Sequence, residues 1–426
     1  MKAMWASDEP RASTTAVAQQ QWRRRAVGLS LTLSIVALAA CAPRQTAPVI
    51  APPPPPPAGK PTDAKPAEAH RIAILAPLSG SNAPVGISLA NAATLALVDT
   101  GKQGIRLSSY DTAALGAAGA ARRALDDGAQ LILGPLLAGD AAAVKAAADA
   151  RGVTMLSFSN DSSIAGGRLY VLGFQPAQSV GRVVDFASSQ GMKRFAALVP
   201  DGLYGQRTSV AFTRAVSANN GQVVALTNFA RSPSALAPAA RRVTDHDNRL
   251  KRAAKAAPDG TVGSSGPAPV AFDALLIADS GAVAAAFAPH LAKFGAPAGS
   301  FMMMGTELWT TEPALARSAA LKGAVFAAVP DQRFRAMATR YRARFGGTPS
   351  RLASLSYDAM LLAASVADTQ WRPGQPFPQA VLADPQGFAG VDGIFRFRNN
   401  IAERGLEVQQ VTPGGFTTVS PAPKGF

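Results

Sequence analysis

The chain has 426 residues, 48% of them hydrophobic, and 42 Lys and Arg against 27 Asp and Glu give a formal net charge of +15. It contains a single cysteine, which excludes an internal disulfide bond and a cysteine-based metal site. The length exceeds what one ordinary hydrophobic core supports, and this favours a body of two lobes.

The N-terminal segment has the pattern of an export signal. Arg23, Arg24 and Arg25 form a positive cluster, and the uncharged run 26–40 follows them. This run is shorter than the roughly 20 residues that a membrane-spanning helix needs, but it suits the apolar region of a signal peptide. We therefore predict that residues 1–40 are a signal peptide.

The end of this run places Cys41 in a motif. Leu38-Ala39-Ala40-Cys41 resembles the bacterial lipobox, and the resemblance implies that Cys41 is lipidated and attaches the chain to a membrane. A buried apolar helix with a chance cysteine is the competing interpretation. Ala42 follows the cysteine, and the lack of Asp there is typical of lipoproteins on the periplasmic face of the outer membrane. Anchoring in the inner membrane remains the alternative.

Residues 41–69 are rich in Pro and Ala, with six consecutive prolines at Pro52–Pro57. Each proline fixes φ and lacks an N–H donor, so this stretch cannot pack as helix or sheet. It predicts a semi-rigid linker in the extended polyproline conformation, with an inert leader as the alternative.

Beyond the linker, short apolar strands alternate with Ala-rich helices. Strands are predicted at 71–78, 105–110, 131–133, 153–157, 194–199, 223–227, 274–278 and 301–304, and helices at 85–98, 115–126, 141–150 and 205–218. This alternation predicts an α/β architecture with two doubly wound parallel sheets. In such sheets, ligands bind where the carboxyl ends of the strands meet a crevice.

Several motifs within these elements resemble one family. They are Ala76-Pro77-Leu78-Ser79-Gly80 with Gly86, Gly134-Pro135, Ser157-Phe158-Ser159-Asn160, Tyr204-Gly205, Gly305-Thr306-Glu307 and Tyr357-Asp358-Ala359. In this order, over residues 70–400, they resemble the type I periplasmic binding proteins of the leucine-binding class. The resemblance implies a two-lobed fold with a three-strand hinge. Lobe 1 would comprise 70–178 and 305–375, and lobe 2 would comprise 179–304 and 376–426, with a basic, flexible insertion at 231–270.

The same resemblance implies an interlobe ligand site. Its candidate residues are Ser79, Ser157, Ser159, Asn160, Asp161, Tyr204, Asp279 and Glu307. Ser79 lies before a helix N-terminus, where anionic groups are favoured, and Glu307 matches the acid that binds a ligand amino group in amino-acid-binding relatives. Asp279 is the weaker candidate. For Ser157, Ser159, Asn160 and Asp161, local turn chemistry is the alternative interpretation. The alternative is a helix-capping loop for Ser79, a structural role for Tyr204, and a solvated or helix-start carboxylate for Glu307. Tyr357 and Asp358 are interpreted as packing and hinge support.

One stretch departs from the family pattern. Amino-acid-binding relatives place Ser or Thr shortly after the Gly-Pro motif to donate to the ligand carboxylate, whereas this chain has Leu136-Leu137-Ala138. A buried carboxylate without donors is costly, which disfavours an ordinary α-amino acid as ligand. A small polar ligand of another kind remains an expectation.

Nothing in the sequence predicts catalysis. His70, His246 and His290 are scattered without metal-ligand spacing, and neither a Gly-x-Ser-x-Gly elbow nor a Gly-rich phosphate loop after a strand is present. We expect no enzyme activity, no catalytic residue, no metal and no cofactor.

The positive charge is concentrated in residues 231–255, where seven Arg and Lys stand against two Asp, a net charge of +5. One interpretation is a docking arm for an acidic protein or an anionic envelope polymer, and the other is a solvated helix with a loop. Nucleic acid is not an expected partner, because export separates the chain from it.

Two functions follow as hypotheses. The first is a lipid-anchored regulator, because the outer-membrane signal, the linker and the basic segment fit lipoproteins of this fold that resemble activators of penicillin-binding proteins, the peptidoglycan synthases. The alternative is the extracellular solute-binding protein of an amino-acid-type ABC transporter, which the fold and Glu307 fit. An outer-membrane anchor suits that alternative poorly, because the transporter lies in the inner membrane.

Overall fold

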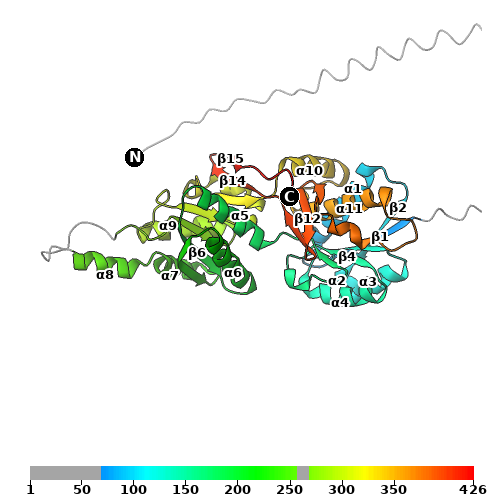
Figure 1. The fold of residues 1–426 in the computed structure, drawn as a ribbon, viewed down its shortest axis with the longest axis horizontal. Coiled ribbons are helices and arrows are strands. Elements are labelled where there is room, and N and C mark those ends of the chain that lie inside the picture. Colours follow the sequence, from blue (N-terminus) through cyan, green and yellow to red (C-terminus); the bar gives the residue numbers. More distant parts are fainter. Residues whose placement is uncertain (1–68, 257–267) are drawn as a thin grey trace, which may run out of the picture. The chain divides into compact units, whose positions relative to one another are not determined.

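The structure is a computed structural model that describes residues 69–256 and 268–426 (Figure 1). These residues belong to one compact unit, Lys65–Phe426. The predicted signal peptide, the lipidation of Cys41 and the Pro-rich linker lie outside the described residues.

Two sheets organise the chain. The first has eight strands in the order β11-β12-β13-β5-β4-β3-β1-β2. Its strands are β1 His70–Ala76, β2 Ile105–Asp111, β3 Leu131–Leu133, β4 Thr154–Ser157, β5 Leu169–Val171, β11 Phe388–Gly390, β12 Gly393–Arg398 and β13 Ile401–Arg404. The second has seven strands in the order β15-β14-β10-β9-β8-β6-β7. Its strands are β6 Arg194–Pro200, β7 Gln222–Phe229, β8 Ala274–Ile277, β9 Met302–Gly305, β10 Val325–Ala328, β14 Glu407–Thr412 and β15 Gly415–Ser420.

Helices cover both faces of each sheet (Figure 1). Those of the first sheet are α1 Ala83–Thr100, α2 Thr112–Leu115, α3 Ala117–Asp126, α4 Ala138–Ala150, α10 Gln332–Phe345 and α11 Ala353–Thr369. Those of the second are α5 Pro176–Ser189, α6 Leu203–Ala218, α7 Pro233–Val243, α8 His246–Ala256 and α9 Gly281–Lys293. Short 3₁₀ turns occupy Ser162–Ile164, Glu307–Thr311, Pro313–Arg317, Ala319–Leu321 and Gln379–Ala383.

The two-sided burial explains the continuous apolar strands. Ile72 and Ile74 of β1 pack in the core shared with α1 and α11, whereas Ala73 and Leu75 pack in the core shared with α3 and α4. Strands of parallel sheets are buried on both faces, and they therefore read as apolar runs rather than as alternating patterns. Among the described helices, only α1 is long and apolar enough to cross a membrane, and here it is a core helix packed on α11.

The predicted two-lobed α/β fold is confirmed. The predicted strands correspond to β1–β4 and β6–β9, and the sheets are mainly parallel. Both carry antiparallel strands from the C-terminal part of the chain, at β11-β12-β13 and at β10-β14-β15, which the sequence did not predict. The chain passes between the sheets three times, as expected, at residues 172–175, 329–331 and 405–406, which we call the hinge segments.

The predicted lobe bounds are wrong at two places. Residues 305–328 were assigned to lobe 1, but β10 pairs with β9 in the second sheet. Residues 388–404 were assigned to lobe 2, but β13 pairs with β5 in the first sheet. Hydrogen-bond pairing between distant strands decides the sheet, and motif order along the chain does not reveal it. Lobe 1 therefore comprises 70–171 and 332–404, and lobe 2 comprises 176–256, 268–328 and 407–420.

The predicted insertion at 231–270 is also too long. Helix α7 is a regular crossover between β7 and β8, with Leu236, Ala239, Ala240 and Val243 buried in the core of lobe 2. The inserted segment begins with α8, and Arg249 binds this helix to the rest of lobe 2. Its buried guanidinium donates to the carbonyl oxygens of Ala268 at 2.7 Å, Thr244 at 3.0 Å and Phe294 at 3.1 Å.

Candidate ligand site at the hinge

A cavity of about 440 Å³ is lined by residues of both lobes. All three hinge segments contribute to it, through Phe174 and Gln175, Val329, and Leu406. The volume lies within the range of roughly 300–1,000 Å³ that is typical of small-molecule sites. A hollow of about 580 Å³ along α5 and α6 shares Asn160 and Gln175 with it. We assign the ligand site to the smaller cavity, because all three hinge segments line it, whereas the hollow along α5 and α6 reaches the hinge only at Gln175.

The loop after β1 contributes little to the cavity wall. A Cβ atom at residue 86 would lie 1.9 Å from the carbonyl oxygen of Pro77, so glycine there lets α1 pack closely on this loop. Asn82 and Val85 line the cavity. Ser79 does not; it is exposed, and its hydroxyl hydrogen-bonds to Asp111, which lowers the pKa of that carboxyl.

The serine side chains after β4 form hydrogen bonds with backbone groups of lobe 1. Gly134-Pro135 is a cis peptide, and the Pro135 carbonyl accepts from Ser157 Oγ at 3.0 Å and from the Phe158 amide at 3.0 Å. Ser159 Oγ accepts from the backbone amide of Asp161 at 3.0 Å. Both serines are buried and absent from the cavity lining, whereas Asn160 lines it. This is the turn chemistry that stood as the alternative interpretation.

The two predicted aspartates form ion pairs instead of lining the cavity. Asp161, in lobe 1, accepts from Arg207 on α6 of lobe 2 at 2.7 Å. Asp279 accepts from Arg231 at 2.7 Å and from the Ser280 amide at 2.7 Å. Its main-chain carbonyl accepts from Trp309 Nε1 at 3.0 Å, so this residue organises lobe 2.

Glu307 lines the cavity, but its carboxyl group already has partners. Ser179 Oγ donates to Oε2, and Tyr204 donates to Oε1 at 3.3 Å. The Tyr204 hydroxyl also lies 3.1 Å from Thr306 Oγ1. Burial raises the pKa of Glu307 and, together with the charge of Glu307, that of Tyr204. Tyr204 does not line the cavity; it positions the Glu307 carboxyl.

The hinge side of the cavity carries two arginines that the sequence analysis did not single out. Arg404 ends β13, is 6% exposed, and lies between two rings, 5.1 Å from the centroid of Phe174 and 5.2 Å from that of Phe395. Its Nη2 donates to the carbonyl of Leu172 at 2.8 Å. Its Nε and Nη1 are buried and have no hydrogen-bond partner in the described part of the chain.

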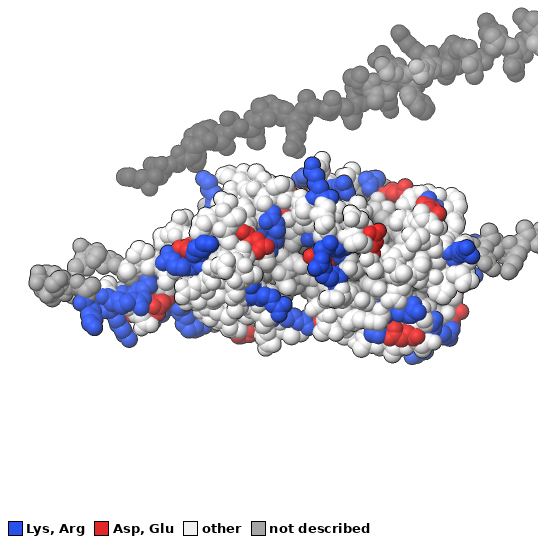
Figure 2. Space-filling view, in the orientation of Figure 1, with Lys and Arg blue, Asp and Glu red and all other residues white. Residues whose placement is uncertain are grey.

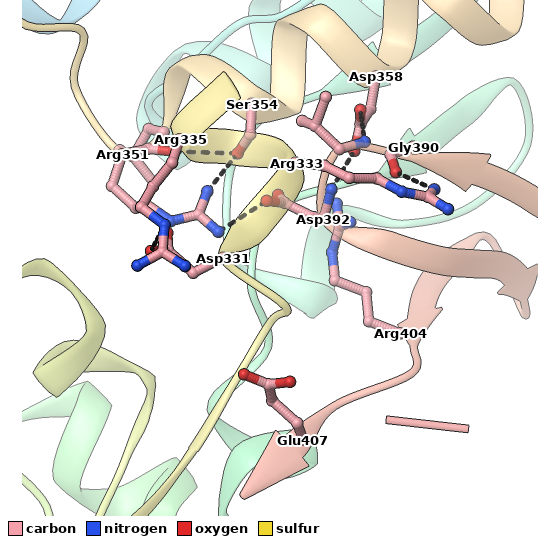
Figure 3. A network of polar contacts seen from close by, with 12 residues as sticks. Asp331, Arg333, Arg335, Arg351, Ser354, Asp358, Gly390, Asp392, Arg404 and Glu407 are labelled. Atoms are coloured by element: carbon pink, nitrogen blue, oxygen red, sulfur yellow. Dashed lines mark hydrogen bonds and ion pairs between the residues drawn. The ribbon is translucent and has the colours of Figure 1, made fainter. Parts of the chain in front are cut away.

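Arg351 is the second arginine of this wall. Its side chain is 8% exposed; Nη2 pairs with the fully buried Asp392 at 2.7 Å, and Nη1 donates to Ser354 Oγ at 2.9 Å (Figure 3). Within residues 69–256 and 268–426, its buried Nε has no partner. The guanidinium lies 4.1 Å from the ring centroid of Phe334.

Asp358 completes this cluster. It accepts from the backbone amides of Val391 at 2.7 Å and Asp392 at 3.3 Å. Figure 3 shows Arg404 pointing toward Asp358 and Asp392. Burial, with the charge of Asp392 as the second cause, raises the pKa of Asp358 to about 7. Tyr357, its neighbour, donates to Asp99 at 2.6 Å. The packing role predicted for these two residues is confirmed.

The described residues hold no group of three or more His, Cys, Asp or Glu side chains that would suit a metal ion. The charged groups of the cavity wall are the Glu307 carboxyl and the two guanidinium groups. The arrangement can therefore hold a small molecule through its charge and its apolar surface.

Comparisons with known proteins agree with this architecture. The model of the periplasmic binding protein family matches residues 69–415. An uncharacterized protein of Rickettsia prowazekii is 26% identical over 176 residues, which are 41% of this chain and 47% of that protein. The chain thus aligns with about half the length of this curated relative.

Solved structures show the same fold. A periplasmic ligand-binding protein of a branched-chain amino acid ABC transporter from Burkholderia xenovorans aligns with a TM-score of 0.61 and 19% identity, over 83% of this chain and 95% of its own. A solute-binding protein from Rhodopseudomonas palustris, in complex with 3,4-dihydroxybenzoic acid, aligns with a TM-score of 0.58 and 19% identity. The alignment covers 84% of this chain and 97% of that protein. The isoleucine complex of a branched-chain amino acid binding protein from Streptococcus pneumoniae aligns with a TM-score of 0.54 and 19% identity. The alignment covers 83% of this chain and 100% of that protein.

The class that the fold and the hinge cavity define is thus the two-lobed type I periplasmic binding protein. The chain belongs to the periplasmic binding protein family, and its fold is that of the leucine-binding class. Membership of this family implies a periplasmic or extracellular location.

Proposed function

We propose that the chain is a non-enzymatic envelope protein that binds a small ligand in the cavity at its hinge. The observation that carries this proposal is the participation of all three hinge segments in one cavity. A ligand there contacts both lobes and the segments that join them, so it favours one lobe arrangement by its differential contacts. The neighbours in complex with 3,4-dihydroxybenzoic acid and isoleucine support small-molecule binding by this fold.

An ordinary α-amino acid is not the ligand that the site favours. Glu307, the group that would bind an ammonium, is engaged by Ser179 and Tyr204. The carboxylate end would meet Leu136 and Leu137, which present no hydroxyl donor. A ligand with an ammonium and a carboxylate on one carbon would leave its ammonium without a free carboxylate partner on the cavity wall.

The test uses a thermal-shift screen of small envelope metabolites, followed by calorimetry on the hits. Leu137 lines the cavity and is 41% exposed, so Leu137→Trp obstructs the cavity without disturbing the core. Leu115→Trp is the matched control, because Leu115 is 52% exposed and does not line the cavity. We expect hits that Leu137→Trp abolishes and Leu115→Trp retains. Hits that both variants retain would contradict the assignment of the cavity.

For the physiological role, we propose lipid anchoring through Cys41 at the periplasmic face of the outer membrane, and regulation of peptidoglycan synthases. The observation that favours this role is the basic helix α8, where Lys251, Arg252 and Lys255 are exposed. Figure 2 shows Lys and Arg side chains gathered over this helix. Clustered positive charge favours association with an acidic protein surface or an anionic polymer.

This role is tested by crosslinking in envelopes with the three α8 residues changed to Ser. The matched control changes three exposed arginines of lobe 1, Arg106, Arg122 and Arg372, to Ser. We expect only the α8 variant to lose a crosslinked peptidoglycan synthase. Equal crosslinking by both variants would count against α8 as the docking surface.

The competing role is that of the solute-binding protein of an amino-acid-type ABC transporter, which the transporter proteins among the structural neighbours favour. Membrane fractionation separates the two roles. Recovery in the outer membrane, lost on Cys41→Ala, supports the regulator. Recovery in the inner membrane, together with a permease in the crosslinked material, supports the transporter role.

A further inference from the structure

We infer that the hinge cavity selects ligands with a single carboxylate on an apolar body, with Arg404 and Arg351 as the specificity-determining residues. This inference rests on the proposed ligand binding and adds the chemical class of the ligand.

The first step is the charge of the cavity wall. Two arginines line it against one carboxyl group, that of Glu307. Hydrogen bonds from Ser179 and Tyr204 hold this carboxyl, and burial raises its pKa. Behind the wall, Asp392 pairs with Arg351, but the pKa of Asp358 is raised to about 7. Among the side chains that line the cavity itself, two positively charged groups thus stand against one carboxyl group.

The second step concerns donors without acceptors. Only one of the three nitrogens of Arg404 donates to the described chain, and Arg351 Nε is also unused. A buried donor left unsatisfied is costly, and more so when the group is charged. Guanidinium groups present their donors in a planar fork that matches a carboxylate. Both arginines line the cavity, so an anionic group there meets two guanidinium groups.

The third step is the remaining surface, which is apolar. Leu136, Leu137, Phe158, Val329, Leu352 and Leu406 contribute to it. Burying apolar surface is favourable, so the body of the ligand gains affinity here without hydrogen bonds. No free carboxylate on the wall remains for an ammonium, which separates this class from zwitterionic amino acids.

The position of Arg404 links the anion to the hinge. Arg404 precedes the third hinge segment, and its Nη2 donates to Leu172 in the first. Phe174, also in the first segment, stacks on the same guanidinium. A carboxylate bound to Arg404 therefore changes the contacts of two hinge segments at once.

The experiment compares three compounds with one body and different charge, by calorimetry on the purified chain. They are 3-phenylpropionate, its uncharged amide 3-phenylpropanamide, and the cation 3-phenylpropylamine; benzoate and octanoate extend the acid series. We expect the acids to bind, the amide to bind at least tenfold more weakly, which corresponds to about 1.4 kcal/mol, and the amine not to bind.

A charge placed at the exposed Leu137 tests the same point without disturbing the buried arginines. Leu137→Glu should weaken binding of 3-phenylpropionate at least tenfold relative to Leu137→Gln, which has the same shape without the charge. Unfolding curves of the two variants verify that both fold. Equal affinity of the two variants for the acid would overturn the inference.

Two further outcomes are distinguishable. If the amide or the amine binds as tightly as the acid, and Leu137→Trp abolishes that binding, the carboxylate preference is wrong and the proposed ligand binding stands. If no acid of the series binds, the inference is overturned. The proposed function fails with it only when the metabolite screen also yields no hit that depends on Leu137.

Discussion

The strand-end loops beside the cavity and the hinge wall of the cavity differ in how their polar groups are satisfied. In the loops after β1 and β4, Ser79, Ser157 and Ser159 do not line the cavity and bond to their own lobe. On the hinge wall, Arg351 and Arg404 keep buried donors without partners in the described chain. Hydroxyl groups near strand ends are thus not sufficient evidence of a ligand site. Unused hydrogen-bonding capacity at a cavity is the better indicator.

The largest effect on stability is expected from removing one member of the buried ion pair in the hinge wall. Arg351→Met leaves the fully buried Asp392 without its partner, and loss of one member of a buried pair lowers the free energy of unfolding by about 3–5 kcal/mol. Urea denaturation measures this. The double variant Arg351→Met/Asp392→Leu should recover most of the loss. Arg123→Met, which removes the exposed pair with Asp127, is the control, with a loss below about 1 kcal/mol. Similar losses in Arg351→Met and Arg123→Met would contradict a buried charge cluster at the hinge.

The second prediction concerns pH. The pKa of Asp358 is about 7 in the folded chain, against an ordinary value of 3.8 for an aspartate side chain. Between these values the folded state binds more protons than the unfolded state, so the contribution of Asp358 to stability falls as pH rises from about 4 to about 7. Asp358→Asn should remove this decline in urea denaturation at pH 4 to 8. Asp273→Asn is the control. The pKa of Asp273 is lowered to about 2, so this carboxyl group titrates outside the window from pH 4 to 8. A decline that persists in Asp358→Asn would contradict the assignment.

A substitution in the loop after β4 should cause a smaller loss of stability and no loss of ligand affinity. Ser157→Ala removes the bond to the Pro135 carbonyl and the acceptor for the Ser159 amide. Loss of a typical buried hydrogen bond lowers the free energy of unfolding by about 1 kcal/mol. Calorimetry on the same variant should give unchanged ligand affinity, because Ser157 does not line the cavity. A large loss of affinity with unchanged stability would return Ser157 to the ligand site.

The smallest effect is expected from Glu307→Gln. Gln keeps the shape and can still accept from Tyr204, while it removes negative charge from the wall. The affinity for 3-phenylpropionate should stay the same or rise a few-fold. Leucine serves as the comparison ligand. Loss of leucine binding on Glu307→Gln would show instead that this carboxyl recognises an ammonium group.

The sequence predicts the fold well for a physical reason. Strands such as β1 and β6 are buried on both faces, so their apolar runs stand out between amphipathic helices. The site is harder to predict. Asn160 and Glu307 line the cavity as expected, because they follow strand ends. Arg404 and Leu172 are 232 residues apart and meet only through the pairing of β13 with β5, which no local pattern reveals. The same pairing explains why the predicted lobe bounds were wrong.

The most direct test of small-ligand binding at the hinge is the identification of what the protein carries from the cell. The chain is purified from envelopes without denaturation, then unfolded, and the released small molecules are identified by mass spectrometry. We predict one apolar monocarboxylate in near-equal amount with the protein, retained in Leu137→Gln and lost in Leu137→Glu. Release of the same molecule from Leu137→Glu, or of a cationic or zwitterionic molecule that Leu137→Trp also retains, would contradict the hinge cavity as a carboxylate site.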